Sequence, residues 1–98
     1  MPTFIGQLRF KGPSKPSGKA ELGVARSARA LTDVHGGRIL SIYWTEGEVD
    51  ILVTVEGKNE DQATTIFREL EDQEKVDIRI IRALTEGEKE RLIPDKSV

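Results

Sequence analysis

Two arginines, a tyrosine and an aspartate fall where the sequence predicts an uncovered face of a β-sheet. They are Arg9, Tyr43, Asp50 and Arg79. Guanidinium groups bind carboxylate and phosphate oxygens, and a carboxylate beside a phenol can take part in proton transfer. Because Tyr43 and Asp50 flank a short turn, we expect them to face each other across a hairpin. The prediction is a site for a small polar or anionic ligand, with a structural polar network and catalysis as the open alternatives.

Several other kinds of chemistry lack the residues they need. The chain of 98 residues has no cysteine and one histidine, which excludes disulfides, thiolate catalysis and multi-histidine metal sites. The segment 12–19 is not a phosphate-binding loop, since the spacing of its glycines is wrong and Ala20 follows its lysine. We expect His35 at a helix end rather than in a catalytic site. The sequence predicts no metal and no cofactor.

Composition and charge limit the partners and the compartment. The formal net charge is −2, so nothing global indicates nucleic-acid binding. No apolar run approaches the roughly 20 residues that span a bilayer. The N-terminus lacks the charged start and long apolar stretch of a signal peptide. We therefore expect a cytoplasmic protein that binds neither nucleic acid nor membrane.

The elements that position the four candidate residues alternate between strand and helix patterns. Period-2 alternation, clearest in the β-branched run from Val49 to Val55, predicts the strands. They are expected at 3–10, 38–44, 49–56 and 76–83. Helices are expected at 20–35, after the N-cap Asn59 and, as a short C-terminal helix, after the capping box that opens at Thr85. Residues 11–19 are predicted to form a flexible loop, and residues 94–98 a frayed tail.

This order predicts an α+β fold of the ferredoxin-like plan, β-α-β-β-α-β, as a single domain over residues 1–98. Right-handed crossovers give an antiparallel sheet of order 4-1-3-2 with both helices on one face. Alternation assigns Leu40 and the core residue Trp44 to the helix side. The other face keeps five apolar side chains: Ile5, Ile39, Tyr43, Leu52 and Ile81. Such an uncovered patch predicts a homodimer whose sheets pack face to face.

The hairpin sequence 43–50, YWTEGEVD, resembles the signature of the GYD-domain family, small proteins of the dimeric α+β barrel group. The similarity extends from Gly36 to Thr85 and includes the segment 82–86, RALTE. One departure is Val49, where the family pattern has tyrosine. The resemblance implies the fold and a homodimer or larger homo-oligomer, and it names no common reaction.

The same hairpin pattern, Gly-x-x-Asp followed by alternating apolar residues, is similar to effector-binding modules of leucine-responsive regulators. Those modules bind amino acids at subunit interfaces. Other members of the wider group are cofactor-free oxygenases and isomerases that work over the open sheet. We therefore expect a small-molecule-binding or regulatory dimer. The alternatives are a cofactor-free enzyme of the oxygenase or isomerase type in the same cavity, and a purely structural oligomer subunit.

Overall fold

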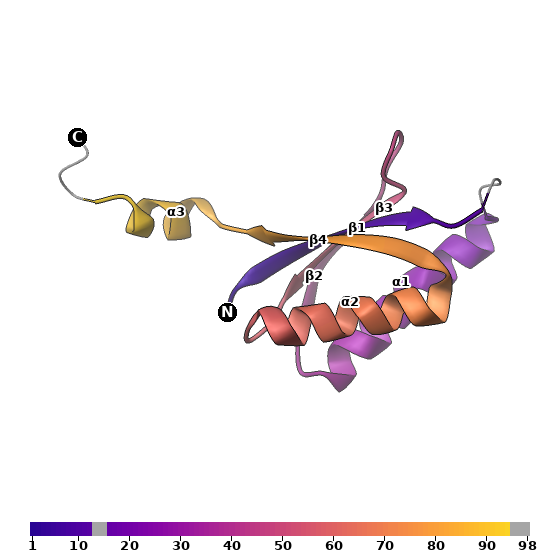
Figure 1. Cartoon of the computed structure of the whole chain (residues 1–98), viewed down its shortest axis with the longest axis horizontal. Helices are drawn as coiled ribbons and strands as arrows, with labels where there is room; N and C mark the ends of the chain where they lie inside the picture. Colours follow the sequence, from indigo (N-terminus) through magenta and orange to yellow (C-terminus); the bar gives the residue numbers. More distant parts are fainter. Residues whose placement is uncertain (13–15, 95–98) are drawn as a thin grey trace.

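A computed structural model describes residues 1–12 and 16–94 of the chain, and parts of the predicted loop and tail lie outside them. The elements are β1 (Thr3–Phe10), α1 (Gly18–Val34), β2 (Arg38–Trp44), β3 (Ile51–Glu56), α2 (Glu60–Glu74), β4 (Val76–Ala83) and α3 (Glu86–Leu92). The strands form one antiparallel sheet in the order β2-β3-β1-β4, with α1 and α2 on one face (Figure 1). The ferredoxin-like prediction, including its strand order, is confirmed.

Side-chain caps fix where the helices begin. The Ser17 hydroxyl accepts a hydrogen bond from Ala20 N, so α1 begins at Gly18, inside the predicted loop. The Asn59 side chain caps α2 by accepting from Gln62 N at 2.9 Å. The capping box that begins at Thr85 is present in full at the start of α3. Two of the three predicted helix starts are therefore correct. The third helix, α1, begins two residues earlier than predicted, at Gly18 instead of Ala20.

The core lies between the sheet and the two long helices. Phe67 of α2 is fully buried, and its ring lies over Gly6 of β1, where an added Cβ would come within 2.4 Å of it. Glycine at this position therefore lets α2 approach the sheet closely. Trp44, predicted as a core residue, lies at the rim of this layer and remains 42% exposed.

The strand β2 contains a β-bulge that the alternation does not predict. Ile39 pairs with Val55 and Ser41 pairs with Thr54, which leaves Leu40 as the extra residue. Ile39 consequently packs against the core, and the prediction that it lies on the open face is wrong. Leu40, predicted for the helix side, is 41% exposed. A one-residue insertion reverses the faces of the residues that precede it.

The connection between β2 and β3 is longer than predicted. It runs over residues 45–50, because β3 begins at Ile51 and Val49 belongs to the loop. The Thr45 hydroxyl donates to Val49 O at 2.6 Å, and Thr45 N donates to Asp50 O at 2.9 Å. The closed loop stands on the side of the sheet that the helices leave open (Figure 1).

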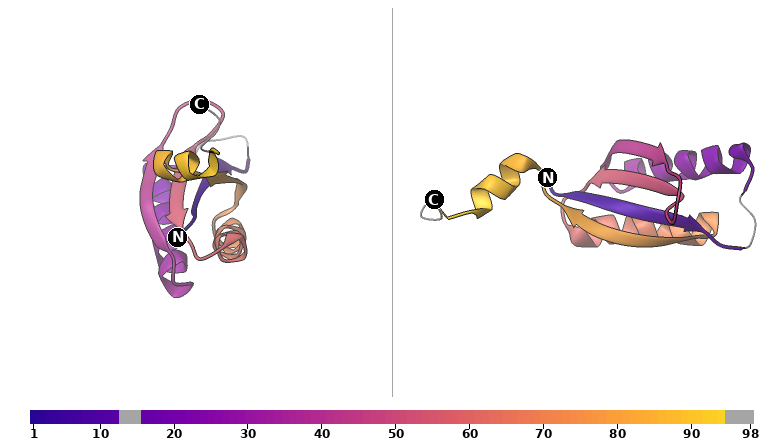
Figure 2. Two further views of the ribbon diagram at one scale, coloured as in Figure 1. Left: turned by 90° about the vertical axis from the view of Figure 1, so that its left-hand side faces the viewer. Right: turned by 90° about the horizontal axis from the view of Figure 1, so that it is seen from above.

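The short helix α3 lies beyond the end of β4, away from the sheet (Figures 1 and 2). None of its residues is buried. Leu84, Leu92 and Ile93, in and beside it, are 43%, 67% and 47% exposed. No helix within the described ranges is both long and apolar enough to cross a membrane.

Candidate functional site

The sheet is seen from above in Figure 2 (right). Strand register decides which side chains share a row on its open face. One row crosses all four strands, because Tyr43 pairs with Leu52, Leu52 with Gln7 and Gln7 with Arg79. The row on one side contains Ser41, Thr54, Ile5 and Ile81, and its two isoleucines pair with each other, with Ile5 diagonally opposite Leu52 of the Tyr43 row. On the other side of the Tyr43 row, Arg9 lies opposite Asp77. The open face therefore has an apolar middle and a charged end.

A cavity of about 400 Å³ lies at this charged end. Its lining consists of Gln7, Arg9, Glu48, Val49, Glu71, Asp77, Ile78 and Arg79. Neither the Arg9 nor the Arg79 guanidinium forms a hydrogen bond or ion pair with another described residue. The carboxylate of Asp77 has one weak partner, Lys11 Nζ at 3.7 Å. The cavity thus offers two free cations beside acidic side chains of the sheet and of the 45–50 loop.

Tyr43 lies outside this cavity. It occupies the far end of the row that holds Arg79, three strand spacings or roughly 14 Å away. Its side chain is 63% exposed. The structure therefore brings together two of the four predicted site residues, Arg9 and Arg79, and leaves Tyr43 on the open face at the opposite edge.

Asp50 forms hydrogen bonds to β1 that the sequence did not predict. Its Oδ2 accepts a hydrogen bond from Phe10 N at 2.8 Å, and its own N donates to Leu8 O at 2.9 Å. Asp50 thereby extends the β1–β3 pairing past the end of β3. Tyr43 pairs with Leu52, so the prediction that Tyr43 and Asp50 face each other is wrong. The cause is the longer loop, which turns the Asp50 carboxylate toward β1.

The loop residue Glu48 is the part of the site that sequence reasoning missed. It had the pattern of a solvated acidic side chain, and its place beside the cavity depends on how residues 45–50 fold back over the sheet. The only local signal was Gly47, whose φ of 117° permits that turn.

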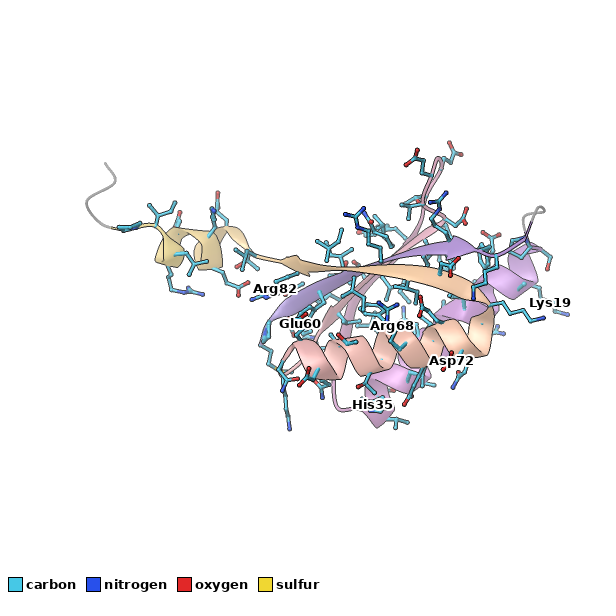
Figure 3. The ribbon with its side chains drawn as sticks, viewed as in Figure 1. Lys19, His35, Glu60, Arg68, Asp72 and Arg82 are labelled. Atoms are coloured by element: carbon cyan, nitrogen blue, oxygen red, sulfur yellow. The ribbon has the colours of Figure 1, made fainter. Side chains whose placement is uncertain are left out.

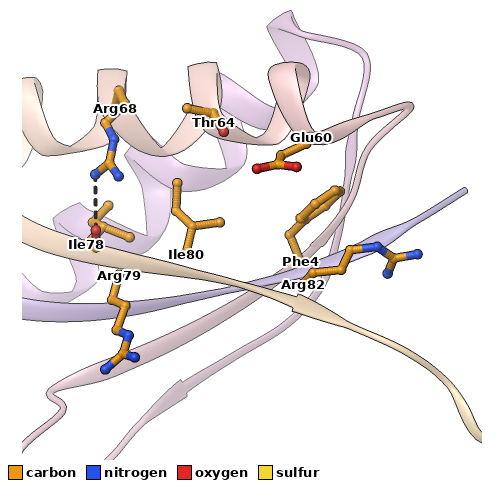
Figure 4. Close-up of a pocket in the computed structure, with 8 residues that line it drawn as sticks. All are labelled: Phe4, Glu60, Thr64, Arg68, Ile78, Arg79, Ile80 and Arg82. Carbon is orange, nitrogen blue, oxygen red and sulfur yellow. Dashed lines mark hydrogen bonds between the residues drawn. The ribbon is translucent and has the colours of Figure 1, made fainter.

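A larger cavity of about 640 Å³ lies on the helix side, between α2 and β4 (Figure 4). Two of its three arginines, Arg68 and Arg82, already have partners, and the third, Arg79, also lines the smaller cavity. Arg68 Nη1 donates to Ile78 O at 3.0 Å and lies 2.8 Å from Glu71 Oε1. Arg82 donates to Thr3 O and lies over the ring of Phe4. The smaller cavity is the better ligand site, since its guanidinium groups are unpaired.

Glu71 and Arg68 together form a clamp on β4. Glu71 Oε2 accepts from Ile78 N at 2.7 Å, while Arg68 binds the carbonyl of the same residue. Burial raises the pKa of Glu71, but the bond from Ile78 N and the Arg68 guanidinium outweigh it and lower the pKa below 4.5. The clamp is therefore charged at neutral pH and ties α2 to the sheet edge.

His35 lies far from the open face, at the C-terminal end of α1, as predicted (Figure 3). Its Nε2 is 2.9 Å from Glu69 Oε2, and its carbonyl accepts a hydrogen bond from Gln62 Nε2. These contacts join α1 to α2. His35 therefore has a structural setting rather than a place in the candidate site.

The fold recurs in transcriptional regulators. An AsnC family transcriptional regulator from Agrobacterium tumefaciens matches with a TM-score of 0.66 and 13% identity, over 87% of this chain and 51% of that one. The leucine response regulatory protein LrpA of Mycobacterium tuberculosis matches with a TM-score of 0.60 and 15% identity, over 86% and 51%. The chain spans about half the length of these regulators, and the likeness shows the fold alone.

A third solved structure of the same fold is the C-terminal domain of the MgtC protein from Mycobacterium tuberculosis. It matches with a TM-score of 0.59 and 14% identity, over 84% of this chain and 86% of that one. No sequence among the curated proteins matches. The family model of the GYD domain matches residues 14–93, which include the hairpin and all three helices. The chain therefore belongs to the GYD domain family.

Proposed function

We propose that this chain is a small-molecule-binding regulatory module that works as a homodimer joined through its open sheet face. The observation that carries the proposal is the cavity in which unpaired Arg9 and Arg79 lie beside Glu48 and Asp77. A cavity with free charges of both signs favours a zwitterion over a simple anion. An amino acid fits this chemistry, with its carboxylate on the guanidinium groups and its ammonium on the carboxylates.

The apolar middle of the open face supports the proposal that a second copy of the chain binds there. Ile5, Leu52 and Ile81 are only half-buried, and Tyr43 beside them is exposed. Burying such side chains is favourable by about 1.5–3 kcal/mol for each one fully covered. An isologous contact through this patch would cover it on both protomers at once and close the open side of the charged cavity.

Calorimetric titration with L-leucine tests the ligand. The compound is the first probe because one regulator of the same fold is called a leucine response regulatory protein. Arg79→Ala removes one charge-assisted contact worth about 1.5–3 kcal/mol, so we expect affinity to fall at least tenfold. Arg26→Ala, on the exposed surface of α1, is the matched control and should bind as the wild type does. Equal affinity in the Arg79→Ala and wild-type proteins, or no heat at millimolar L-leucine, would contradict the proposal.

Sedimentation velocity tests the open-face dimer separately. Ile5→Lys places a charge beside Leu52 and Ile81, in the apolar middle of the open face, and should convert the dimer into a monomer. Leu22→Lys is the control, since Leu22 is a 50% exposed apolar residue on α1, on the other side of the molecule. A dimer that survives Ile5→Lys would show that the chains associate elsewhere.

A further inference from the structure

The strand β4 lies at the edge of the sheet, and its backbone direction follows from its neighbours. In β1, Leu8 O and Phe10 N bond to Asp50, so even-numbered residues of β1 face β3 and odd-numbered residues face β4. Because β1 pairs odd residues with odd residues of β4, the even residues of β4 direct their N–H and C=O groups outward. The outward residues include Ile78, Ile80 and Arg82.

Only part of this edge is covered. At Ile78 both outward groups are taken by the clamp, as Figure 4 shows for the bond from Arg68. The outward groups of Ile80 and Arg82 have no such partner within residues 1–12 and 16–94. Here α2 stands away from the strand and leaves the 640 Å³ cavity. An uncovered strand edge is a template for pairing with another chain.

We propose that β4 pairs antiparallel with β4 of a second copy about a two-fold axis at Ile81, which continues the two sheets into one. In this register Ile80 lies opposite the partner's Arg82, and the two residues exchange hydrogen bonds in both directions. The same exchange is repeated across the axis. The pairing therefore uses the uncovered outward groups of both chains and leaves both clamps intact.

Alternative registers are disfavoured by the charges and by the clamp. An axis at Arg79 or at Arg82 places two guanidinium groups directly opposite each other, which is destabilising. An axis at Ile80 places Arg82 opposite the partner's Ile78, whose backbone groups are occupied, so the outward groups of Arg82 stay unpaired. An axis at Ile81 instead places Ile81 opposite its own copy, an apolar pair. Of these four registers, the one centred on Ile81 uses the outward groups of both Ile80 and Arg82 and opposes no like charges.

The segment that follows β4 supports a second copy as the occupant. In the same register Leu84, which is 43% exposed, lies opposite the partner's Ile78. Beyond it α3 continues away from its own sheet with no buried residue (Figure 1). A two-fold axis at Ile81 carries each α3 toward the other protomer, where its exposed Leu92 and Ile93 gain a surface to pack on. This contact is separate from the open face, so either can fail without the other.

Amide hydrogen exchange measured by NMR on the wild-type chain tests the pairing. We expect the amides of Ile80 and Arg82 to be protected in concentrated protein and to lose that protection on dilution. The Ile78 amide, held by Glu71, should remain protected throughout. The proposal would be overturned if, at the highest concentration, the amides of Ile80 and Arg82 exchanged as fast as exposed amides. That result would also show that nothing binds this edge stably in the purified protein.

A matched pair of variants gives the second readout. Ile80→Pro removes the outward N–H, and an edge strand tolerates proline where that group faces solvent. Ile80→Ala loses the same side-chain packing and keeps the N–H. Sedimentation velocity should show the mass of the assembly halved in Ile80→Pro and unchanged in Ile80→Ala. An equal mass in the two folded variants would overturn the β4 pairing, while the Ile5→Lys result reports on the open face alone.

Discussion

The same four strands supply two faces of the sheet that differ in what covers them. The helix face is closed by α1 and α2, and its apolar residues, such as Phe67 and Val55, are fully buried. The open face leaves Ile5, Leu52 and Ile81 half-buried beside the free guanidinium groups of Arg9 and Arg79. The helix face therefore stabilises the single chain, whereas the open face is available to a second chain and a ligand.

The largest effect is expected when the side chain at the centre of the helix face, Phe67, is removed. Phe67→Ala should lower the free energy of unfolding by about 3–5 kcal/mol, because it leaves a cavity under Gly6. Urea denaturation at low protein concentration measures this. Tyr43→Ala, on the open face, is the counterpart and should change the stability of the single chain by no more than about 0.5 kcal/mol. Similar losses in the free energy of unfolding of both variants would contradict this difference between the two faces.

A smaller change overfills the same contact. Gly6→Ala brings a methyl group within 2.4 Å of the Phe67 ring, so we expect a loss of about 1–3 kcal/mol. Gly23→Ala in α1 is the matched control, since the nearest atom to its added Cβ is 3.9 Å away. Replacing that helical glycine should stabilise the fold by about 0.5–1 kcal/mol. Opposite signs in the two thermal unfolding experiments are the expected outcome, and equal signs would contradict the close packing at Gly6.

The clamp at Ile78 predicts a dependence on pH. Since the pKa of Glu71 is lower in the folded than in the unfolded chain, its stabilisation is complete above pH 4.5 and lost as pH falls through the folded value. Glu71→Gln should cost about 1 kcal/mol at neutral pH. Urea denaturation of both proteins over a pH series should show this difference shrink on acidification. A difference that is constant from pH 7 to pH 3 would rule out the charged clamp.

The smallest predicted effect concerns the contact that joins the two helices. Glu69→Gln weakens the pair with His35 and should cost about 0.5 kcal/mol, since both side chains are partly exposed. The loss should diminish in high salt, because screening weakens the pair in the wild-type chain. Thermal unfolding at two salt concentrations measures it. A larger loss of stability that is the same at both salt concentrations would show that Glu69 contributes through packing instead.

The element order was predictable because its signals are local. Alternation along β3 and the caps at Asn59 and Thr85 each depend on a few neighbouring residues. The bulge in β2 was not predictable, because Ile39 and Leu40 are both apolar and adjacent. Either of them can face the core, and only pairing with β3 decides between them. The wrong assignment of Ile39 follows from that ambiguity.

The candidate site was predictable only where it rests on regular strands. Arg9 and Arg79 lie on uninterrupted β1 and β4, so alternation alone places both on the open face. Asp50 and Glu48 belong to the 45–50 loop, whose length and path depend on hydrogen bonds made by Thr45 and by β1. No periodic signal reports such contacts. The loop side of the site therefore had to come from the structure.

Native mass spectrometry of the purified chain is the most direct test of the claim that the open face serves association and binding. We expect twice the chain mass of 10.9 kDa, or a multiple of that dimer mass, with added mass when L-leucine is supplied. A chain that remains monomeric, without bound L-leucine, at micromolar concentration would contradict it.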